Sequence, residues 1–129
     1  MPKIMAKNIS KDILEKTFKA FLSYVEGFVG ENKAWELVQQ SRQETEKYYK
    51  NLSLIQLDEK KNLVLVNPTI SDKELLGFSL WMSKFVAELK EFMVGVGKVE
   101  PEKILGTLKK SLEPTGFLEF FQQAKELSF

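Results

Sequence analysis

The chain has 129 residues, of which 43% are apolar and 29% charged, and it contains no histidine and no cysteine. With 19 basic and 18 acidic residues, its net charge is only +1. The two missing residue types exclude an imidazole base, a thiolate nucleophile, ordinary zinc ligation, haem held by histidine and iron–sulfur clusters, so we expect a protein that is not an enzyme and has no cofactor.

The first half of the chain predicts two amphipathic helices separated by Gly30. The first covers residues 10–29, with Ser10 as its N-cap and Gly30 as its left-handed terminator. Its apolar residues fill an arc of about 200°, which requires more than one packing neighbour. The second covers residues 32–52, and its apolar face continues past Ser41 without a shift. This continuity predicts one uninterrupted helix.

The next segment has a different period and predicts a β-hairpin over residues 54–66. Two short runs, residues 54–57 and 63–66, consist mostly of leucine, isoleucine and valine, and residues 58–62 supply turn-forming side chains. A hairpin of two strands is only marginally stable in water. We therefore expect it to lie on the helices or to pair with another edge.

A third helix is expected to form the centre of the fold. It opens at a capping box that begins with Ser71 and is ended by Gly95 and Gly97. Apolar residues repeat along it at alternating spacings of three and four, which is a heptad seam. The seam consists of Leu75, Phe78, Met82, Phe85, Leu89, Phe92 and Val96.

The remaining chain predicts two shorter helices. Pro101 opens the first, which continues through Leu112, and Pro114 separates it from a last helix that begins near Phe117. This last segment is rich in phenylalanine, which indicates either buried core or a surface for a partner. The residues of this possible partner surface are Phe117, Phe120, Phe121 and Phe129.

These elements predict a mainly α fold. We expect residues 1–129 to form a single domain, a compact bundle of about five helices with a small β-hairpin between the second and third helices. Residues 1–10 lack the apolar run of a signal peptide, and Lys84 and Glu88 interrupt the most apolar segment. We therefore expect no membrane span and a cytoplasmic location.

One set of large apolar residues could either pack as core or line a pocket for a small apolar ligand. Aromatic residues at helical spacing are usually core, and a pocket between helices is the alternative. The residues concerned are Trp35, Phe78, Trp81, Met82 and Phe85.

The sequence contains no complete motif for phosphate binding, metal binding or catalysis. The segment from Gly95 to Lys98 resembles the end of a phosphate-binding loop, but Phe92 stands where that loop needs its first glycine. Acidic residues two apart, as in Glu44 and Glu46, lie on different sides of a helix and cannot share an ion. We therefore assign no catalytic, metal or cofactor-binding residue.

A winged-helix DNA-binding protein is the alternative fold interpretation. Residues 41–44 form a second capping box, so residues 41–52 could be a recognition helix and the hairpin a wing. The unbroken apolar face past Ser41, two acidic residues in that helix and the balanced charge of the hairpin tip argue against it. Nucleic acid is therefore not an expected partner.

The sequence thus favours a non-catalytic module for protein interaction or ligand sensing. The apolar faces predict self-association, as a homodimer formed through the heptad seam or through hairpin edges, or binding to another protein.

Overall fold

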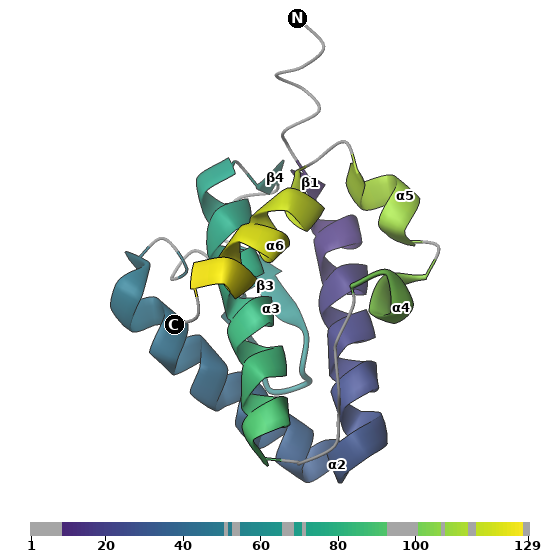
Figure 1. Ribbon diagram of the computed structural model, residues 1–129, viewed down its shortest axis with the longest axis vertical. Coiled ribbons are helices and arrows are strands. Elements are labelled where there is room, and N and C mark those ends of the chain that lie inside the picture. The colour runs from purple at the N-terminus through teal and green to yellow at the C-terminus, as the bar shows by residue number, and fades with distance from the viewer. Residues whose placement is uncertain are drawn as a thin grey trace, which may run out of the picture.

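The described part of the chain is mainly helical, with five helices and a small β-hairpin between α2 and α3, as the sequence predicted (Figure 1). The computed structural model describes residues 9–50, 52, 55–65, 69–70, 72–92, 101–106, 108–113 and 116–127. In chain order the elements are β1 (Ile9–Ser10), α2 (Lys11–Tyr48), β2 (Ile55–Leu57), β3 (Leu63–Leu65), β4 (Thr69–Ile70), α3 (Asp72–Phe92), α4 (Pro101–Leu105), α5 (Leu108–Leu112) and α6 (Phe117–Leu127).

The helix α2 is divided into two arms by Gly30. This residue has φ 85° and ψ 169°, a conformation that is almost confined to glycine, and helical geometry resumes directly after it. The two arms, residues 11–29 and 31–48, therefore form a V with Gly30 at its apex (Figure 1). The predicted break at Gly30 is confirmed, while the second arm ends at Tyr48, before the predicted limit of Leu52.

The second arm continues through Ser41 without interruption. Ser41 is buried, and its hydroxyl donates a hydrogen bond of 3.0 Å to the carbonyl of Val38, one turn back in the helix. Thr45 is also buried, and its hydroxyl donates to the Ser41 carbonyl at 2.8 Å. These bonds satisfy the hydroxyl groups within the helix, so polar residues can lie in its buried face. The break that a winged-helix interpretation requires at Ser41 is not present.

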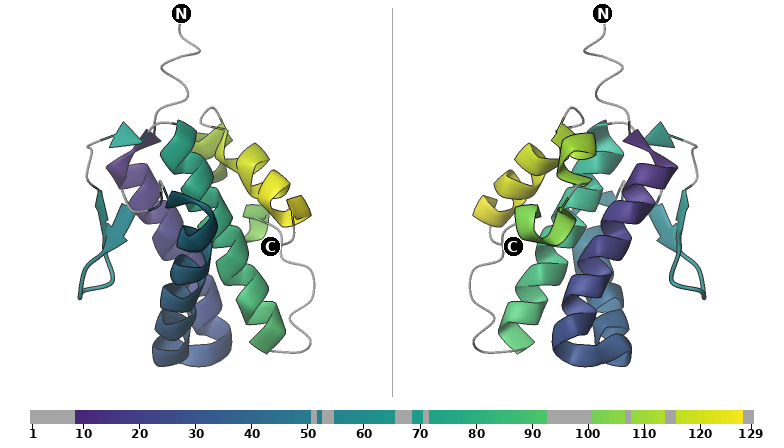
Figure 2. Two further views of the ribbon diagram at one scale, coloured as in Figure 1. Left: turned by 90° about the vertical axis from the view of Figure 1, so that its left-hand side faces the viewer. Right: turned by 90° about the vertical axis from the view of Figure 1, so that its right-hand side faces the viewer.

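The hairpin lies across the two arms of α2, on the side opposite to α4, α5 and α6 (Figure 2). Strands β2 and β3 are antiparallel, with Ile55 opposite Leu65 and Leu57 opposite Leu63. The inward residues Ile55 and Leu63 are buried. The Lys19 ammonium of the first arm donates to the carbonyl of Lys61 at 2.7 Å, which holds the turn to α2.

A second short ladder, absent from the sequence prediction, joins the starts of two helices. Strands β1 and β4 are antiparallel, with Ile9 opposite Ile70 and Ser10 opposite Thr69. Helix α2 begins directly after β1, and α3 begins shortly after β4. The ladder therefore places the N-terminal ends of α2 and α3 side by side (Figure 1).

Helix α3 occupies the centre, as predicted, between α2 and α6 (Figure 1). The described members of its predicted seam are buried up to Leu89, whereas Phe92 is 53% exposed. The predicted end of this helix at Gly95 and Gly97 lies outside the described residues. None of the described helices is long and apolar enough to cross a membrane.

The helix predicted from Pro101 to Leu112 is two short helices instead. Gly106, with φ 56°, separates α4 from α5, because this left-handed conformation cannot continue an α-helix. Both α4 and α5 pack against α2. A sequence pattern of spaced leucines did not reveal this break.

A cluster of aromatic rings joins α2, α3 and α6. The Trp81 ring lies 5.4 Å from that of Phe18 and 6.0 Å from that of Phe78, between centroids. Phe117 of α6 lies 5.8 Å from Phe78 and 6.3 Å from Phe21. These separations are typical of packed aromatic pairs, which bury a large apolar area per residue. The cluster therefore connects the three longest helices in one core.

Candidate functional site

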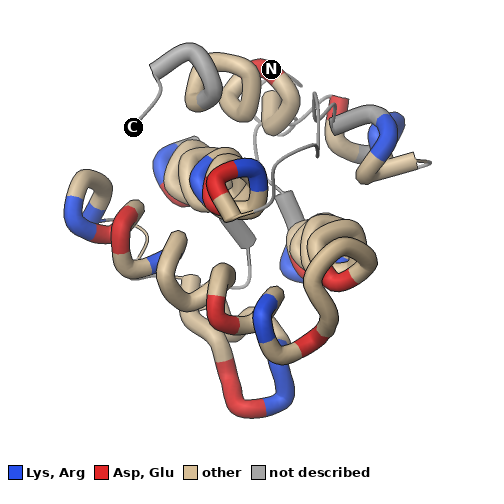
Figure 3. Tube along the Cα trace, turned by 60° about the horizontal axis from the view of Figure 1, so that its bottom comes forward, with Lys and Arg blue, Asp and Glu red and all other residues tan. Residues whose placement is uncertain are grey.

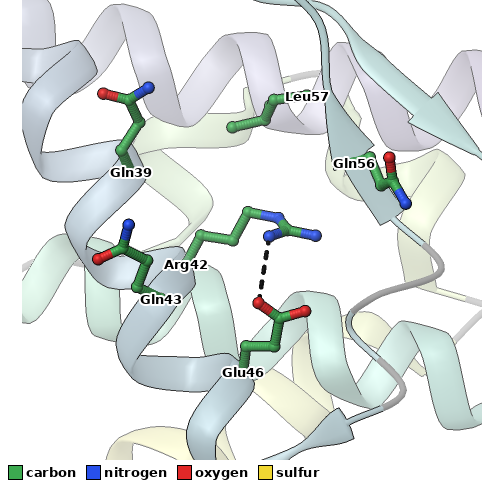
Figure 4. A pocket seen from close by; sticks show the side chains of 6 residues that line it. All are labelled: Gln39, Arg42, Gln43, Glu46, Gln56 and Leu57. Carbon is green, nitrogen blue, oxygen red and sulfur yellow. Dashed lines mark hydrogen bonds and ion pairs between the residues drawn. The ribbon is translucent and has the colours of Figure 1, made fainter.

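A polar groove lies between the second arm of α2 and strand β2 (Figure 4). Its volume is about 480 Å³. We call it the α2–β2 groove, and its lining residues are Gln39, Arg42, Gln43, Glu46, Gln56 and Leu57. Arg42 and Gln43 follow Gln39 by three and four positions and precede Glu46 by four and three, which places all four residues on one side of α2.

The side chain of Arg42 extends from α2 toward β2 (Figure 4) and forms the floor of the groove. Its Nε and one terminal nitrogen donate to the carbonyl of Ile55 at 3.2 and 2.7 Å, and that nitrogen also reaches the Leu52 carbonyl at 3.4 Å. The other terminal nitrogen lies 3.4 Å from the Glu46 carboxylate. Arg42 is only 18% exposed. The planar guanidinium thus holds the start of the hairpin on α2.

Strand β2 presents its unpaired edge to this groove. The Asp58 N–H donates to the Asn62 carbonyl at 3.0 Å, so Asp58 points its backbone groups toward β3. Backbone groups alternate in direction along a strand, so those of Ile55 and Leu57 point away from β3. The bond from Arg42 to the Ile55 carbonyl agrees with this direction. Among the described residues, none bonds to the backbone N–H or C=O of Leu57.

The groove continues along α2 toward its C-terminal end. A neighbouring depression of about 320 Å³ is lined by Gln43, Glu46, Lys47 and Lys50. The Lys47 ammonium pairs with Glu44 at 3.0 Å. No described residue forms an ion pair with Lys50. The groove therefore has a neutral centre and a positive charge at one end.

The chemistry open to this groove is hydrogen bonding. Each glutamine amide offers an acceptor oxygen and two N–H donors, and the amide group stays uncharged near neutral pH. The charges of Arg42 and Glu46 offset one another. Such a lining suits a neutral ligand that both donates and accepts hydrogen bonds.

A carboxylate with a raised pKa lies on α3 and is not among the residues that line the groove. Burial, with the nearby carboxylates of Glu44 and Glu91, raises the pKa of Glu88, against the opposing effect of Lys84. One oxygen of Glu88 is buried without a hydrogen-bond partner among the described residues. Within that part of the chain, no three acidic side chains come close enough together to hold a metal ion. Glu88 is therefore a half-buried carboxylate whose charged form is disfavoured by its surroundings.

The residues predicted as core or apolar pocket are mostly core. Phe78, Trp81, Met82 and Phe85 are 0% exposed, while Trp35 is partly buried against the core. The Trp81 indole N–H donates to the hydroxyl of Ser41 at 3.1 Å and to the Val38 carbonyl at 3.3 Å. This tryptophan therefore links α3 to α2 by hydrogen bonds as well as by packing.

The four phenylalanines predicted as core or partner surface are divided by the structure. Phe117 and Phe121 are buried and belong to the core. Phe120 is partly buried against it, and Phe129 lies outside the described residues. The first two are therefore not exposed to a partner, because α6 turns them toward α2 and α3.

Sequence reasoning did not identify the α2–β2 groove. Arg42 had a predicted role only within the winged-helix alternative, as part of a capping box and as a DNA contact, and no role was predicted for the glutamines. One signal was present: Gln39, Gln43 and Glu46 recur at helical spacing on the polar side of α2. The approach of β2 to that side depends on tertiary packing, which the spacing does not encode.

No family model, no curated protein and no solved structure matches this chain.

Proposed function

We propose that the protein is a non-catalytic interaction module that binds another protein through its surface. The observation that supports this most directly is the edge of β2 in the α2–β2 groove, where the N–H and C=O of Leu57 have no partner among the described residues. An exposed strand edge is a common template for pairing with a second chain.

The burial of the apolar residues supports a surface site rather than an internal one. Most of the described heptad seam is buried inside the chain, so it is not available for a second helix. Phe78 and Trp81, which could have lined a ligand pocket, contact each other in the core, and Trp81 also contacts Phe18. The groove contains amides and paired charges, which favour binding over proton transfer.

Site-specific crosslinking tests this function. A photoreactive benzoylphenylalanine replaces Gln39, on the rim of the groove, or Gln40, its exposed neighbour on α2, as a matched control. We expect protein adducts of defined mass in the native cell from position 39 and not from position 40. Equal adducts from both positions, or none from position 39, would contradict the proposal.

Self-association is the finer form of this proposal. Of the two predicted routes to a homodimer, pairing of hairpin edges remains compatible with the buried seam, and it would use the outer edge of β3, because the edge of β2 is the site proposed for another protein. Light scattering measures the mass directly, and we expect a dimer at high micromolar concentration. A monomer there would contradict self-association and leave a different protein as the partner.

Binding to DNA receives less support. Basic and acidic residues are interspersed along the described chain (Figure 3), and α2 does not break at Ser41. DNA binding depends on a concentrated positive surface and weakens steeply with salt. A low-salt mobility shift with random duplex is expected to show no complex.

A cytoplasmic location and a small apolar ligand stay predictions from the sequence.

A further inference from the structure

We propose that the α2–β2 groove binds an extended peptide segment of a partner protein, which adds as a strand to the free edge of β2. This inference deepens the proposed interaction function and rests on it. It assigns the site, the conformation of the bound segment and its chemical character.

The backbone of β2 sets where the added strand begins. The Ile55 carbonyl is already occupied by Arg42, whereas both backbone groups of Leu57 face the groove and have no partner in the described part of the chain. An added strand therefore exchanges its hydrogen bonds with Leu57. Because Arg42 blocks the preceding outward position, the register of the added strand is restricted.

The opposite wall of the groove supplies the second set of partners. An extended peptide directs its backbone N–H and C=O groups alternately to its two sides. One side meets β2, and the other meets the amides of Gln39 and Gln43 on α2. An amide side chain can pair with either an N–H or a C=O. Both edges of a peptide therefore find partners in this groove, which a single open strand edge does not offer.

The charges define the character of the segment. At the centre, Arg42 and Glu46 lie 3.4 Å apart and offset one another, so an uncharged stretch of peptide fits there. Toward the C-terminal end of α2, the ammonium of Lys50 has no ion-pair partner among the described residues. The segment is thus uncharged over the groove and carries an acidic side chain near Lys50.

Selection from a displayed library of random linear heptapeptides on the full chain tests this site. The selected peptides are synthesised, and their dissociation constants are measured by fluorescence anisotropy. We expect uncharged sequences followed or preceded by an acidic residue. For those peptides, Lys50→Gln weakens binding, and added salt reduces the difference.

The decisive comparison is Leu57→Pro against Leu57→Ala. Both variants lose the leucine side chain, but only proline removes the outward N–H, and it leaves the ladder toward β3 intact because that N–H is not part of it. We expect Leu57→Pro to bind the peptides about tenfold more weakly than Leu57→Ala, because a buried peptide carbonyl loses its donor. Gln43→Ala also weakens binding, while Gln40→Ala does not.

Circular dichroism first establishes that both variants fold. If Leu57→Pro does not fold, hydrogen exchange on the unchanged chain replaces it, and the peptide is expected to slow exchange of the Leu57 amide. No enriched peptide, equal affinity of the two variants, or an unprotected Leu57 amide would overturn this site. If the peptide site is overturned but position 39 still gives crosslinks, the interaction function is retained. A failure of the peptide site can therefore be distinguished from a failure of the proposed function.

Discussion

The ring of Tyr49 requires a glycine at position 77, in the second turn of α3. A Cβ atom at Gly77 would lie 2.8 and 2.9 Å from two ring carbons of Tyr49, closer than atoms pack. The ring cannot easily move, since its hydroxyl donates to the carbonyl of Lys73 at 2.7 Å. Burial and the nearby Glu74 carboxylate raise the pKa of Tyr49, so this donor stays protonated. The close approach of the Tyr49 ring to α3 therefore depends on the missing side chain of Gly77 and on the hydrogen bond of the Tyr49 hydroxyl.

Gly77→Ala is expected to destabilise the protein by about 1 kcal/mol in urea unfolding. Overpacking costs about 1–3 kcal/mol, and better helix propensity returns up to about 1 kcal/mol. Gly27→Ala in α2 is the matched control, because nothing lies within 4 Å of the added Cβ. It is expected to raise stability by about 0.5–1 kcal/mol. Equal gains for the two variants would show that Tyr49 does not restrict Gly77.

The half-buried carboxylate of Glu88 is expected to make stability depend on pH. Its pKa in the folded protein is raised above the ordinary value of 4.5. Between the two values the folded protein binds more protons than the unfolded chain, so the free energy of unfolding falls as the pH rises. The Glu88 carboxylate therefore lowers stability at neutral pH, and this loss disappears as the pH falls through the folded pKa.

Glu88→Gln is therefore expected to stabilise the protein, more at pH 7 than at pH 4. The measurement is the urea-unfolding free energy as a function of pH. Glu59→Gln, at the exposed hairpin tip, is the control for removing one negative charge. If both variants change stability in parallel over this range, the burial of Glu88 is not the cause.

Arg42 attaches the start of the hairpin to α2 by hydrogen bonds. Lysine at this position keeps the charge but not the planar donors that reach the carbonyls of Ile55 and Leu52. We expect Arg42→Lys to lower the free energy of unfolding by about 1–3 kcal/mol, the net value of hydrogen bonds made by a charged group. Urea unfolding measures this loss, and hydrogen exchange at Val64 shows whether the hairpin opens first.

Lys47→Ala provides the comparison for Arg42→Lys. Lys47 also lies on α2 and pairs with Glu44, but its side chain is 65% exposed. Exposed ion pairs contribute little, so a change below about 0.5 kcal/mol is expected. A similar loss for both variants would mean that the carbonyl contacts of Arg42 do not hold the hairpin.

Helix α6 is part of the same cooperative core as α2 and α3. The Phe121 ring is 1% exposed and lies 5.5 Å from that of Phe21. Phe121→Ala is expected to cost about 3–5 kcal/mol. Because the core is shared, unfolding followed by circular dichroism and by tryptophan fluorescence should shift together. A variant in which only the helical signal shifts would show that α6 unfolds separately.

The sequence predicted the helices and the hairpin well, since hydrophobic period and glycine positions are local signals. Gly30 illustrates this, because the residue that breaks the pattern is also the only type that adopts its backbone angles easily. The pairing of β1 with β4 and the split at Gly106 depend on distant contacts or on one backbone angle, and they were missed.

The candidate site was less predictable than the fold. Its residues are polar and ordinary in sequence, and they come from a helix and a strand that meet only after packing. The apolar patterns of α3 and α6 instead made Trp81 a candidate for core or a ligand pocket and Phe117 a candidate for core or a partner surface. Both residues are buried in the core. Apolar patterns locate burial reliably, but they carry no information about which polar residues remain together at the surface.

The position of α6 has a consequence for how the chain is made. Its rings cover Phe21 and Phe78, which belong to segments synthesised much earlier. While the ribosome is still adding α6, one side of the core has no cover, so the nascent chain exposes aromatic surface during translation. Closure of the core therefore follows the emergence of α6 from the ribosome.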